Sequence, residues 1–196
     1  PRVKLCAHLR LPAVTLGRLD DSPHPAVCLD DRQGIHEAVA HLRELGHERI
    51  AHVSGRTDLI HGASRRDAFA ASCDGPIVVA DFTAASGAAA TRELLGGADA
   101  PTAIVFANDV MAIAGLTVAT ELGVRVPDEL SIVGFDDTEL AAHVQPSLTS
   151  VRSDAAGWGR AAARALLDHI EGRSADVELP PARLIVRAST SGRRAP

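Results

Sequence analysis

Pairs of polar side chains directly follow two short apolar segments of the sequence. Asp136 and Asp137 follow "SIVGF", and Asn108 and Asp109 follow "TAIVFA". Arg65 lies in a helical pattern that begins after a third apolar segment, "RIAHVSG". If these segments are parallel strands, their carboxyl ends meet at one edge of the sheet, where open α/β sheets bind ligands. Carboxylates there could cap a helix, bind a metal ion, accept a phosphoryl group or bind a ligand.

Phosphoryl transfer and metal binding are the weaker interpretations. A phosphoryl-accepting Asp136 would need a lysine at another strand end, and Lys4, near the N-terminus, is the only lysine. Asp109, Asp136 and Asp137 offer the oxygen ligands that hard cations prefer, but adjacent carboxylates at one strand end point in different directions. The histidines do not have the common zinc spacings. We therefore expect neither a metal ion nor a cofactor.

Covalent catalysis and nucleic-acid binding also lack support in these residues. The sequence contains no Gly-x-Ser-x-Gly elbow, P-loop or Gly-x-Gly-x-x-Gly run. The segment "TVATELGVRVPDELSIV" has some likeness to a helix-turn-helix, but Pro127 interrupts it, and Asp128 and Glu129 would repel phosphate. The net charge of -5 provides no overall attraction to nucleic acid. We expect no enzyme and no DNA-reading element in this chain.

The remaining interpretation is a site for a small polar ligand. Asp136 offers two acceptor oxygens, Arg65 a planar set of donors, and Asn108 both donates and accepts. Phe82 could pack against the less polar face of a sugar ring. Each residue also has an ordinary structural explanation, such as a core position for Phe82 or a helix cap at Asp109. Their expected position along one edge favours ligand binding.

The segments that would carry these side chains alternate between short strands and longer helices. We expect helices near 33–45, 61–73, 84–96 and 109–122, and strands at 12–16, 26–29, 49–53, 76–80, 102–106 and 131–135. This alternation is typical of βαβ units with a parallel sheet. After Pro146 the pattern predicts a strand at "SLTSV", a helix over 154–171 and a last strand at "ARLIVRAS". These last elements could extend the same sheet or belong to another lobe.

The composition and the N-terminal residues indicate in which cellular compartment the protein is expected. No apolar run approaches the roughly 18 to 20 residues that span a bilayer. The three cysteines are odd in number and contain no Cys-x-x-Cys pair. The N-terminal residues lack the apolar region and cleavage site of a signal peptide. We expect a reduced, cytoplasmic protein with no membrane partner.

Three blocks of the sequence resemble a known family. They are "VCLDDRQGIHEAVAHLRELGHERIAHVSG", "PTAIVFANDVMAIAGLTVATELGVRVPDELSIVGFDDTELA" and "PSLTSVRSD". In this order they resemble the effector-binding region of LacI/GalR-type bacterial transcriptional regulators. The resemblance implies a periplasmic-binding-protein-like α/β fold with ligand between two lobes, a homodimer, and a helix-turn-helix elsewhere in the intact protein. It places the ligand contacts on Arg65, Phe82, Asn108 and Asp136.

The resemblance also implies how the chain is divided. Residues 30–146 and 174–196 would form a complete C-terminal lobe, and residues 1–29 and 147–173 part of an N-terminal lobe, with the DNA-binding helix-turn-helix absent. The expected function is to sense a small effector, a sugar or sugar derivative, and to couple its binding to operator DNA binding by the intact homodimer. An exported solute-binding protein of a sugar transporter is the alternative, because it shares the fold.

Overall fold

The chain forms two compact units. The computed structural model describes residues 8, 11–19 and 22–192. The rest of the segments 1–29 and 174–196, which the sequence assigned to the two lobes, lies outside the described residues. One unit is drawn from residues up to 30 and from 154–181, and the other from 31–153 and from 182 onwards. Within the described residues, no helix is both long and apolar enough to cross a membrane. The larger unit contains every residue for which we expect ligand contact.

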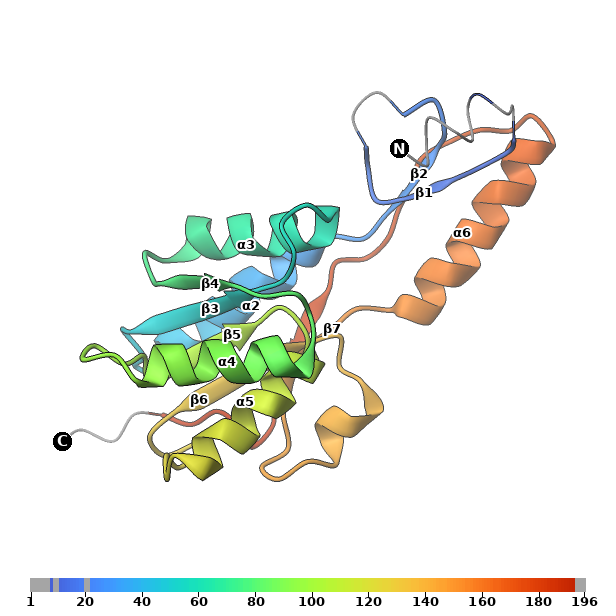
Figure 1. The fold of residues 1–196 in the computed structure, drawn as a ribbon. Coiled ribbons are helices and arrows are strands. Elements are labelled where there is room, and N and C mark those ends of the chain that lie inside the picture. Colours follow the sequence, from blue (N-terminus) through green and yellow to red (C-terminus); the bar gives the residue numbers. More distant parts are fainter. Residues whose placement is uncertain (1–7, 9–10, 20–21, 193–196) are drawn as a thin grey trace. The chain divides into compact units, whose positions relative to one another are not determined.

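A six-stranded sheet lies at the centre of the larger unit (Figure 1). The strand order is β4-β3-β5-β6-β7-β9, and all neighbours are parallel except β7 and β9. The strands are β3 (Ile50–Ser54), β4 (Ile77–Val79), β5 (Ala103–Phe106), β6 (Ser131–Phe135), β7 (Thr149–Arg152) and β9 (Arg183–Ile185). The carboxyl ends of β3, β5 and β6 therefore lie at the same edge, as predicted.

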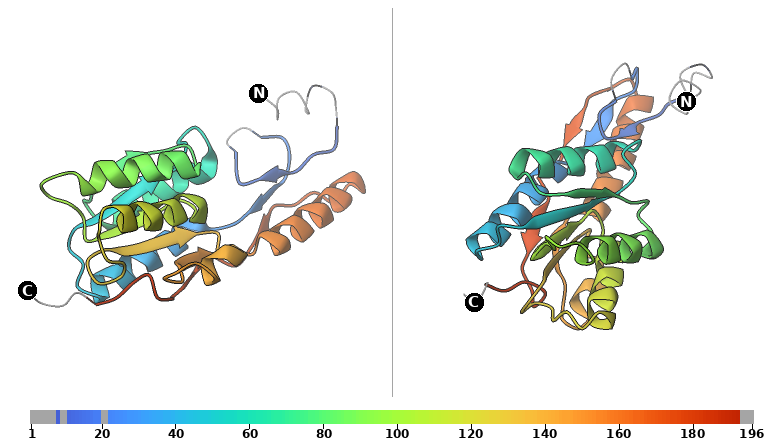
Figure 2. Two further views of the ribbon diagram at one scale, coloured as in Figure 1. Left: turned by 60° about the horizontal axis from the view of Figure 1, so that its bottom comes forward. Right: turned by 60° about the vertical axis from the view of Figure 1, so that its left-hand side comes forward.

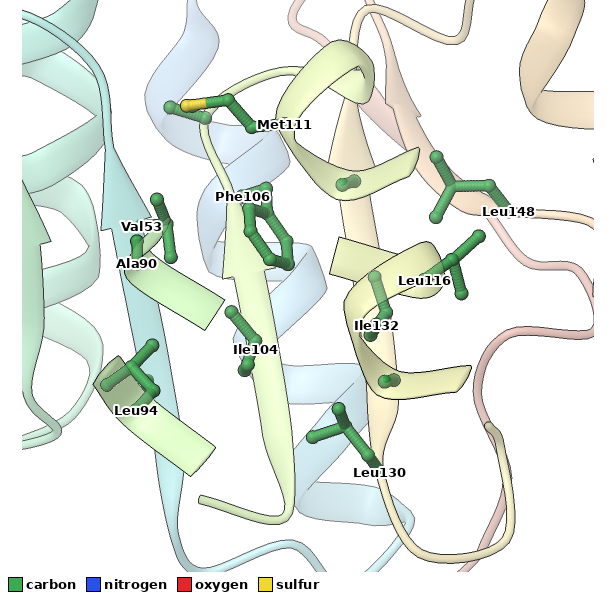
Figure 3. Close-up of a cluster of buried hydrophobic side chains, with 14 of the residues drawn as sticks. Val53, Ala90, Leu94, Ile104, Phe106, Met111, Leu116, Leu130, Ile132 and Leu148 are labelled. Atoms are coloured by element: carbon green, nitrogen blue, oxygen red, sulfur yellow. The ribbon is translucent and has the colours of Figure 1, made fainter. Parts of the chain in front are cut away.

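Helices cover both faces of this sheet (Figure 2). They are α2 (Asp31–Glu44), α3 (Ile60–Ser72), α4 (Ala84–Leu95), α5 (Asp109–Glu121) and the short 3-10 helix η1 (Glu139–Ala142). Alternate residues of one strand face opposite layers: Ile104 and Phe106 pack with α4 and α5, whereas Ala103 and Val105 pack with α2 and α3. Figure 3 shows the first of these two cores, in which Phe106 lies between Val53 and Leu116. A strand buried on both faces explains why these segments are apolar throughout.

The helix boundaries follow from local chemistry. The Asn108 side chain caps α5 by accepting a hydrogen bond from the backbone N–H of Met111 at 2.9 Å. The chain leaves α2 and α5 through Gly46 and Gly123, with φ angles of 83° and 72°. Glycine adopts this left-handed conformation without the steric penalty of a Cβ atom. The predicted ends of both helices are confirmed.

Between residues 11 and 181, the described part of the smaller unit contains a short parallel sheet and the helix that packs on it. Its strands, in the order β1-β2-β8, are β1 (Thr15–Leu16), β2 (Ala26–Cys28) and β8 (Val177–Glu178), and its helix is α6 (Ala155–Ile170). The Asp154 side chain caps α6 by accepting from the N–H of Gly157 at 2.7 Å. Trp158 then donates its indole N–H to the carbonyl of Val27 at 2.9 Å, which ties the helix to the sheet.

The units divide the C-terminal part of the chain at residues other than those predicted. The sequence placed 147–173 in one lobe and 174–196 in the other. Instead, β7 pairs with β6 in the larger unit, and β8 pairs with β2 in the smaller one. The chain changes unit after Ser153 and again after Pro181. Strand membership depends on which neighbour satisfies the backbone hydrogen bonds, and the pattern of a short apolar run does not identify that neighbour.

A buried histidine lies in the middle of the sheet. His52 is completely buried in β3, its Nδ1 donates to the carbonyl of Val105 at 2.8 Å, and its ring stacks on Phe69 with centroids 5.0 Å apart. Its Nε2 has no hydrogen-bond partner among the described residues. The pKa of His52 is lowered from 6.5 to about 4, chiefly by burial; the Val105 hydrogen bond raises it, and the charge of Arg65 contributes to the lowering. His52 is therefore neutral in the folded protein at neutral pH.

We expect His52 to make the fold sensitive to acid. An unfolded chain protonates this histidine near pH 6.5, whereas the folded chain resists protonation until about pH 4. The stability associated with neutral His52 is thus complete above pH 6.5 and is lost as the pH falls towards 4, at about 1.4 kcal/mol per pKa unit or about 3 kcal/mol altogether. Urea unfolding between pH 7 and 4 should show a smaller loss for His52→Phe than for the wild type. Equal losses would contradict this assignment.

Candidate functional site

Arg65 is the centre of a buried ionic cluster at the carboxyl edge of the six-stranded sheet. From α3, its Nε and Nη2 contact Oδ2 of Asp31 at 2.9 and 2.8 Å. Its Nη1 donates to the carbonyl of Ala107 at 2.6 Å and lies 3.7 Å from Oδ1 of Asp136. The guanidinium carbon is 3.5 Å from the centroid of the Phe135 ring. These contacts fix the guanidinium in one orientation between α2 and the ends of β5 and β6.

Asp136 is the part of this cluster that reaches the surface. It directly follows β6, and its backbone N–H donates to the carbonyl of Val151 at 2.8 Å. The side chain is 42% exposed, whereas that of Arg65 is 9% exposed. The pKa of Asp136 is raised to about 6, chiefly by burial; Arg65 lowers it, and the charges of Asp109 and Asp31 contribute to the rise. Asp136 is thus an outward-facing acceptor whose charge changes near pH 6.

Asp137 points away from this cluster. Its Oδ2 accepts from Nε of Arg152 at 2.5 Å, and its Oδ1 lies 2.6 Å from Nη2 of Arg187. The side chain is only 3% exposed. The prediction that adjacent carboxylates at one strand end diverge is confirmed, because Asp136 and Asp137 pair with different arginines.

Asn108 and Phe82 form a pair, and Asn108 is next in the chain to Ala107, whose carbonyl Arg65 contacts. While its Oδ1 caps α5, Nδ2 of Asn108 donates to the carbonyl of Phe82 at 3.0 Å. Phe82 has a φ of 70°, and its ring occupies the space beside Gly55, where a Cβ atom would lie 1.9 Å from Cζ. The His61 ring, on the first turn of α3, has its centroid 5.2 Å from that of Phe82. The segment that follows β5 therefore connects the Arg65 cluster to the pair of Asn108 and Phe82.

Asp109 does not cap α5 as predicted. Asn108 does so, and Asp109 instead connects α5 to the following strands. Its Oδ1 accepts from the hydroxyl of Ser150 at 2.5 Å, and its Oδ2 accepts from the backbone N–H of Thr138 at 2.7 Å. Burial raises the pKa of Asp109, while these hydrogen bonds lower it. A Cβ atom at Gly134 would lie 2.3 Å from Oδ1 of Asp109, so a glycine in β6 makes room for this carboxylate.

Two residues near the candidate ligand contacts were missed in the sequence. Asp31 begins α2 and pairs with Arg65. It is separated from the strand "AVCL" by Asp30, so the strand-end rule, extended by one residue, would have included it. His61 carries no comparable signal, because its position beside Phe82 depends on how the first turn of α3 packs against the loop before α4.

The sequence matches a known family over most of its length. Residues 39–190 match the family described as a periplasmic binding protein-like domain. The chain is 38% identical over 168 residues to the HTH-type transcriptional regulator CelR of Thermobifida fusca, an alignment that covers 82% of this chain and 48% of that protein. The chain spans about half the length of the curated relatives it matches.

Solved structures agree with this relationship. A LacI family transcriptional regulator from Bifidobacterium animalis subsp. lactis has a TM-score of 0.90 and 36% identity, covering 99% of this chain and 74% of that one. The structure of a transcriptional regulator CelR–cellobiose complex has a TM-score of 0.88 and 34% identity, covering 95% and 61%. The chain therefore belongs to the LacI family of transcriptional regulators, within their periplasmic-binding-protein-like region.

Proposed function

We propose that the larger unit binds a small polyhydroxylated effector, a sugar or sugar derivative, where Asp136 and Arg65 meet. The observation that carries this proposal is the outward-facing Asp136 carboxylate, held 3.7 Å from a guanidinium that three other groups fix in place. A carboxylate accepts hydrogen bonds from two neighbouring hydroxyl groups, as a pyranose presents them. Phe82 would pack against the apolar face of the ring, and Asn108 would position Phe82 and contact the effector beside it.

Membership of the LacI family supports a regulatory role for this binding. We propose that the chain is the effector-sensing part of a cytoplasmic regulator and has no catalytic activity. Effector binding would shift the population of conformations of the intact homodimer, and operator DNA would be bound by a part of the protein not contained in these 196 residues. The relatives reported above are regulators, which favours this function over that of a transporter's solute-binding protein.

A thermal-shift screen tests the proposed effector class. Glucose, maltose, cellobiose, adenine and hypoxanthine would be added separately to the protein, and a ligand that binds the native state raises the melting temperature. We expect a sugar to do so, and we expect Asp136→Ala to lose the effect. A melting temperature raised by a nucleobase and by none of the sugars would contradict the proposal that the effector is a sugar.

A surface of the larger unit is suited to the proposed homodimer. A hollow of about 530 Å³ lies between α4 and α5, and its lining is mostly alanine and aliphatic side chains. Beside it, Val110 and Leu140 are 48% and 63% exposed. Arg92 and Glu121, whose side chains form an ion pair of 2.7 Å, also line the hollow. An exposed apolar surface of this kind is typical of an interface between protein chains, and we propose that the partner here is a second copy of this chain.

Charges introduced at this surface should disrupt the dimer. We expect the variant Val110→Glu/Leu140→Glu to sediment as a monomer at concentrations where the wild-type chain is a dimer, because association would bury the two carboxylates. Val186→Glu is the matched control, since Val186 is 56% exposed and lies after β9 rather than at the hollow. Sedimentation velocity would measure all three proteins. A double variant that dimerises as well as the control would exclude this surface.

A further inference from the structure

The turn that carries Asp136 has an unusual backbone. Asp136 and Asp137 are consecutive non-glycine residues with positive φ angles of 105° and 50°. Such angles bring Cβ close to backbone oxygen, so a side-chain-bearing residue adopts them only when surrounding contacts compensate. The contacts that hold this turn therefore determine where the Asp136 carboxylate points.

Backbone hydrogen bonds hold the turn on two sides. The N–H groups of Asp136 and Asp137 donate to the β7 residues Val151 and Ser150, at 2.8 Å to the carbonyl and 3.1 Å to the hydroxyl. The next N–H, that of Thr138, donates to the Asp109 carboxylate at 2.7 Å. These bonds fix the path of the chain, but none of them reaches the side chain of Asp137.

Two arginines hold the Asp137 side chain from the side away from Arg65. Arg152 ends β7, and Arg187 lies two residues after β9, the strand that pairs with β7. Arg187 also donates to the carbonyl of Leu148 at 2.7 Å, which limits its movement. Ion pairs of a buried carboxylate with two arginines are strong and directional. A rotation of the Asp137 backbone would break both.

We propose that Asp137 is a positioning residue, whose ion pairs with Arg152 and Arg187 hold the turn so that the Asp136 carboxylate faces Arg65. This inference rests on the proposed function of Asp136 as an effector contact. Arg152 is two residues from Asp154, where the chain passes from the larger unit to the smaller one.

The variant Arg152→Gln distinguishes two ways in which Arg152 could affect the pKa of Asp136: by holding the turn in place, or by its charge alone. Loss of a positive charge near Asp136 would by itself raise the pKa of this carboxyl. Release of the turn would instead expose the Asp136 carboxylate more fully to water and move it away from the charged groups that face it, namely Arg65, Asp31 and Asp109. Loss of burial, the main cause of the raised pKa of about 6, would outweigh loss of the lowering effect of Arg65, and the pKa would return towards its ordinary value of 3.8. We therefore expect the pKa of Asp136 to fall by about one unit.

The measurement is a carbon-13 NMR titration of the aspartate carboxyl groups, with Asp136→Asn to assign the resonance. Arg152 is 47% exposed and Arg187 stays in place, so the variant should fold, which circular dichroism would verify. Arg152→Lys keeps the charge and should return the pKa of Asp136 close to its wild-type value. Arg56→Gln, which removes the exposed pair of Arg56 and Asp58, should leave it unchanged. An Asp136 pKa that is unchanged or raised in Arg152→Gln would overturn the positioning role.

This titration needs no effector, so its outcome is independent of the effector screen. A lowered pKa together with a screen in which no sugar binds would support the positioning role and contradict the proposed function. An unchanged pKa of Asp136 together with a sugar that binds would contradict the positioning role of Asp137 and support the proposed function. With a binding sugar in hand, calorimetry should show several-fold weaker binding to Arg152→Gln and a return towards wild-type affinity in Arg152→Lys.

Discussion

Asp136→Ala is expected to bind the effector at least about tenfold more weakly than the wild type. Hydrogen bonds from ligand hydroxyls to a charged carboxylate contribute about 1.5–3 kcal/mol each, and every 1.4 kcal/mol corresponds to a factor of ten. Removing the side chain loses these bonds and leaves Arg65 without its outward-facing partner. Isothermal titration calorimetry with the sugar identified by the screen would measure the change.

A matched control and a pH series accompany this variant. Asp67→Ala removes an exposed carboxylate from the helix that carries Arg65, and it should leave affinity unchanged. Since the pKa of Asp136 is about 6, protonation should weaken binding progressively below pH 6 in the wild type. Asp136→Asn cannot ionise and should show no such dependence. Unchanged affinity in Asp136→Ala would remove Asp136 from the site.

Arg65→Leu is expected to lower the free energy of unfolding by about 3–5 kcal/mol. The side chains of Arg65 and Asp31 are 9% and 10% exposed, and their contacts are 2.8 to 2.9 Å long. Without the guanidinium, the Asp31 carboxylate would be buried without a compensating charge, which costs far more than the loss of an exposed ion pair. Chemical denaturation followed by circular dichroism would measure this change.

The double variant Arg65→Leu/Asp31→Asn shows whether the loss of stability in Arg65→Leu comes from the unpaired Asp31 carboxylate or from lost packing. Asparagine has the shape of aspartate without its charge, so the double variant should recover much of the stability lost in Arg65→Leu. Effector binding should not recover, because Arg65 would still be missing from the site. A double variant no more stable than Arg65→Leu would show that the loss comes from packing against Phe135 rather than from the unpaired carboxylate.

The positions of the elements could be predicted from local patterns. The segment around β6 and the helix α5 lie within one or two residues of their expected bounds, because apolar runs and helix-ending glycines act through neighbouring residues. The convergence of Arg65 and Asp136 could also be anticipated, since parallel strands end at the same edge of a sheet. The family resemblance carried by the blocks around these residues is confirmed by the comparisons.

The partners of the buried carboxylates could not be predicted in this way. Asp109 was expected to cap its own helix, but it binds Ser150 and Thr138, which lie 41 and 29 residues further along the chain. Likewise, β7 was expected in the lobe of the helix that follows it, but its backbone pairs with β6. Both outcomes depend on which distant groups the folded sheet brings into hydrogen-bonding distance.

The sequence by itself therefore determined the longer strands and helices and their order along the chain, the edge at which the polar residues gather, and the family resemblance, but it did not indicate β8 or η1. The elements and the edge follow from residue types repeated at short spacing, which act before distant parts of the chain meet, whereas the family was identified from the resemblance of three sequence blocks. Only the tertiary structure decided that Asp136 faces Arg65 while Asp137 faces Arg152 and Arg187. That choice depends on a left-handed turn, and long-range ion pairs and hydrogen bonds supply the energy to hold it.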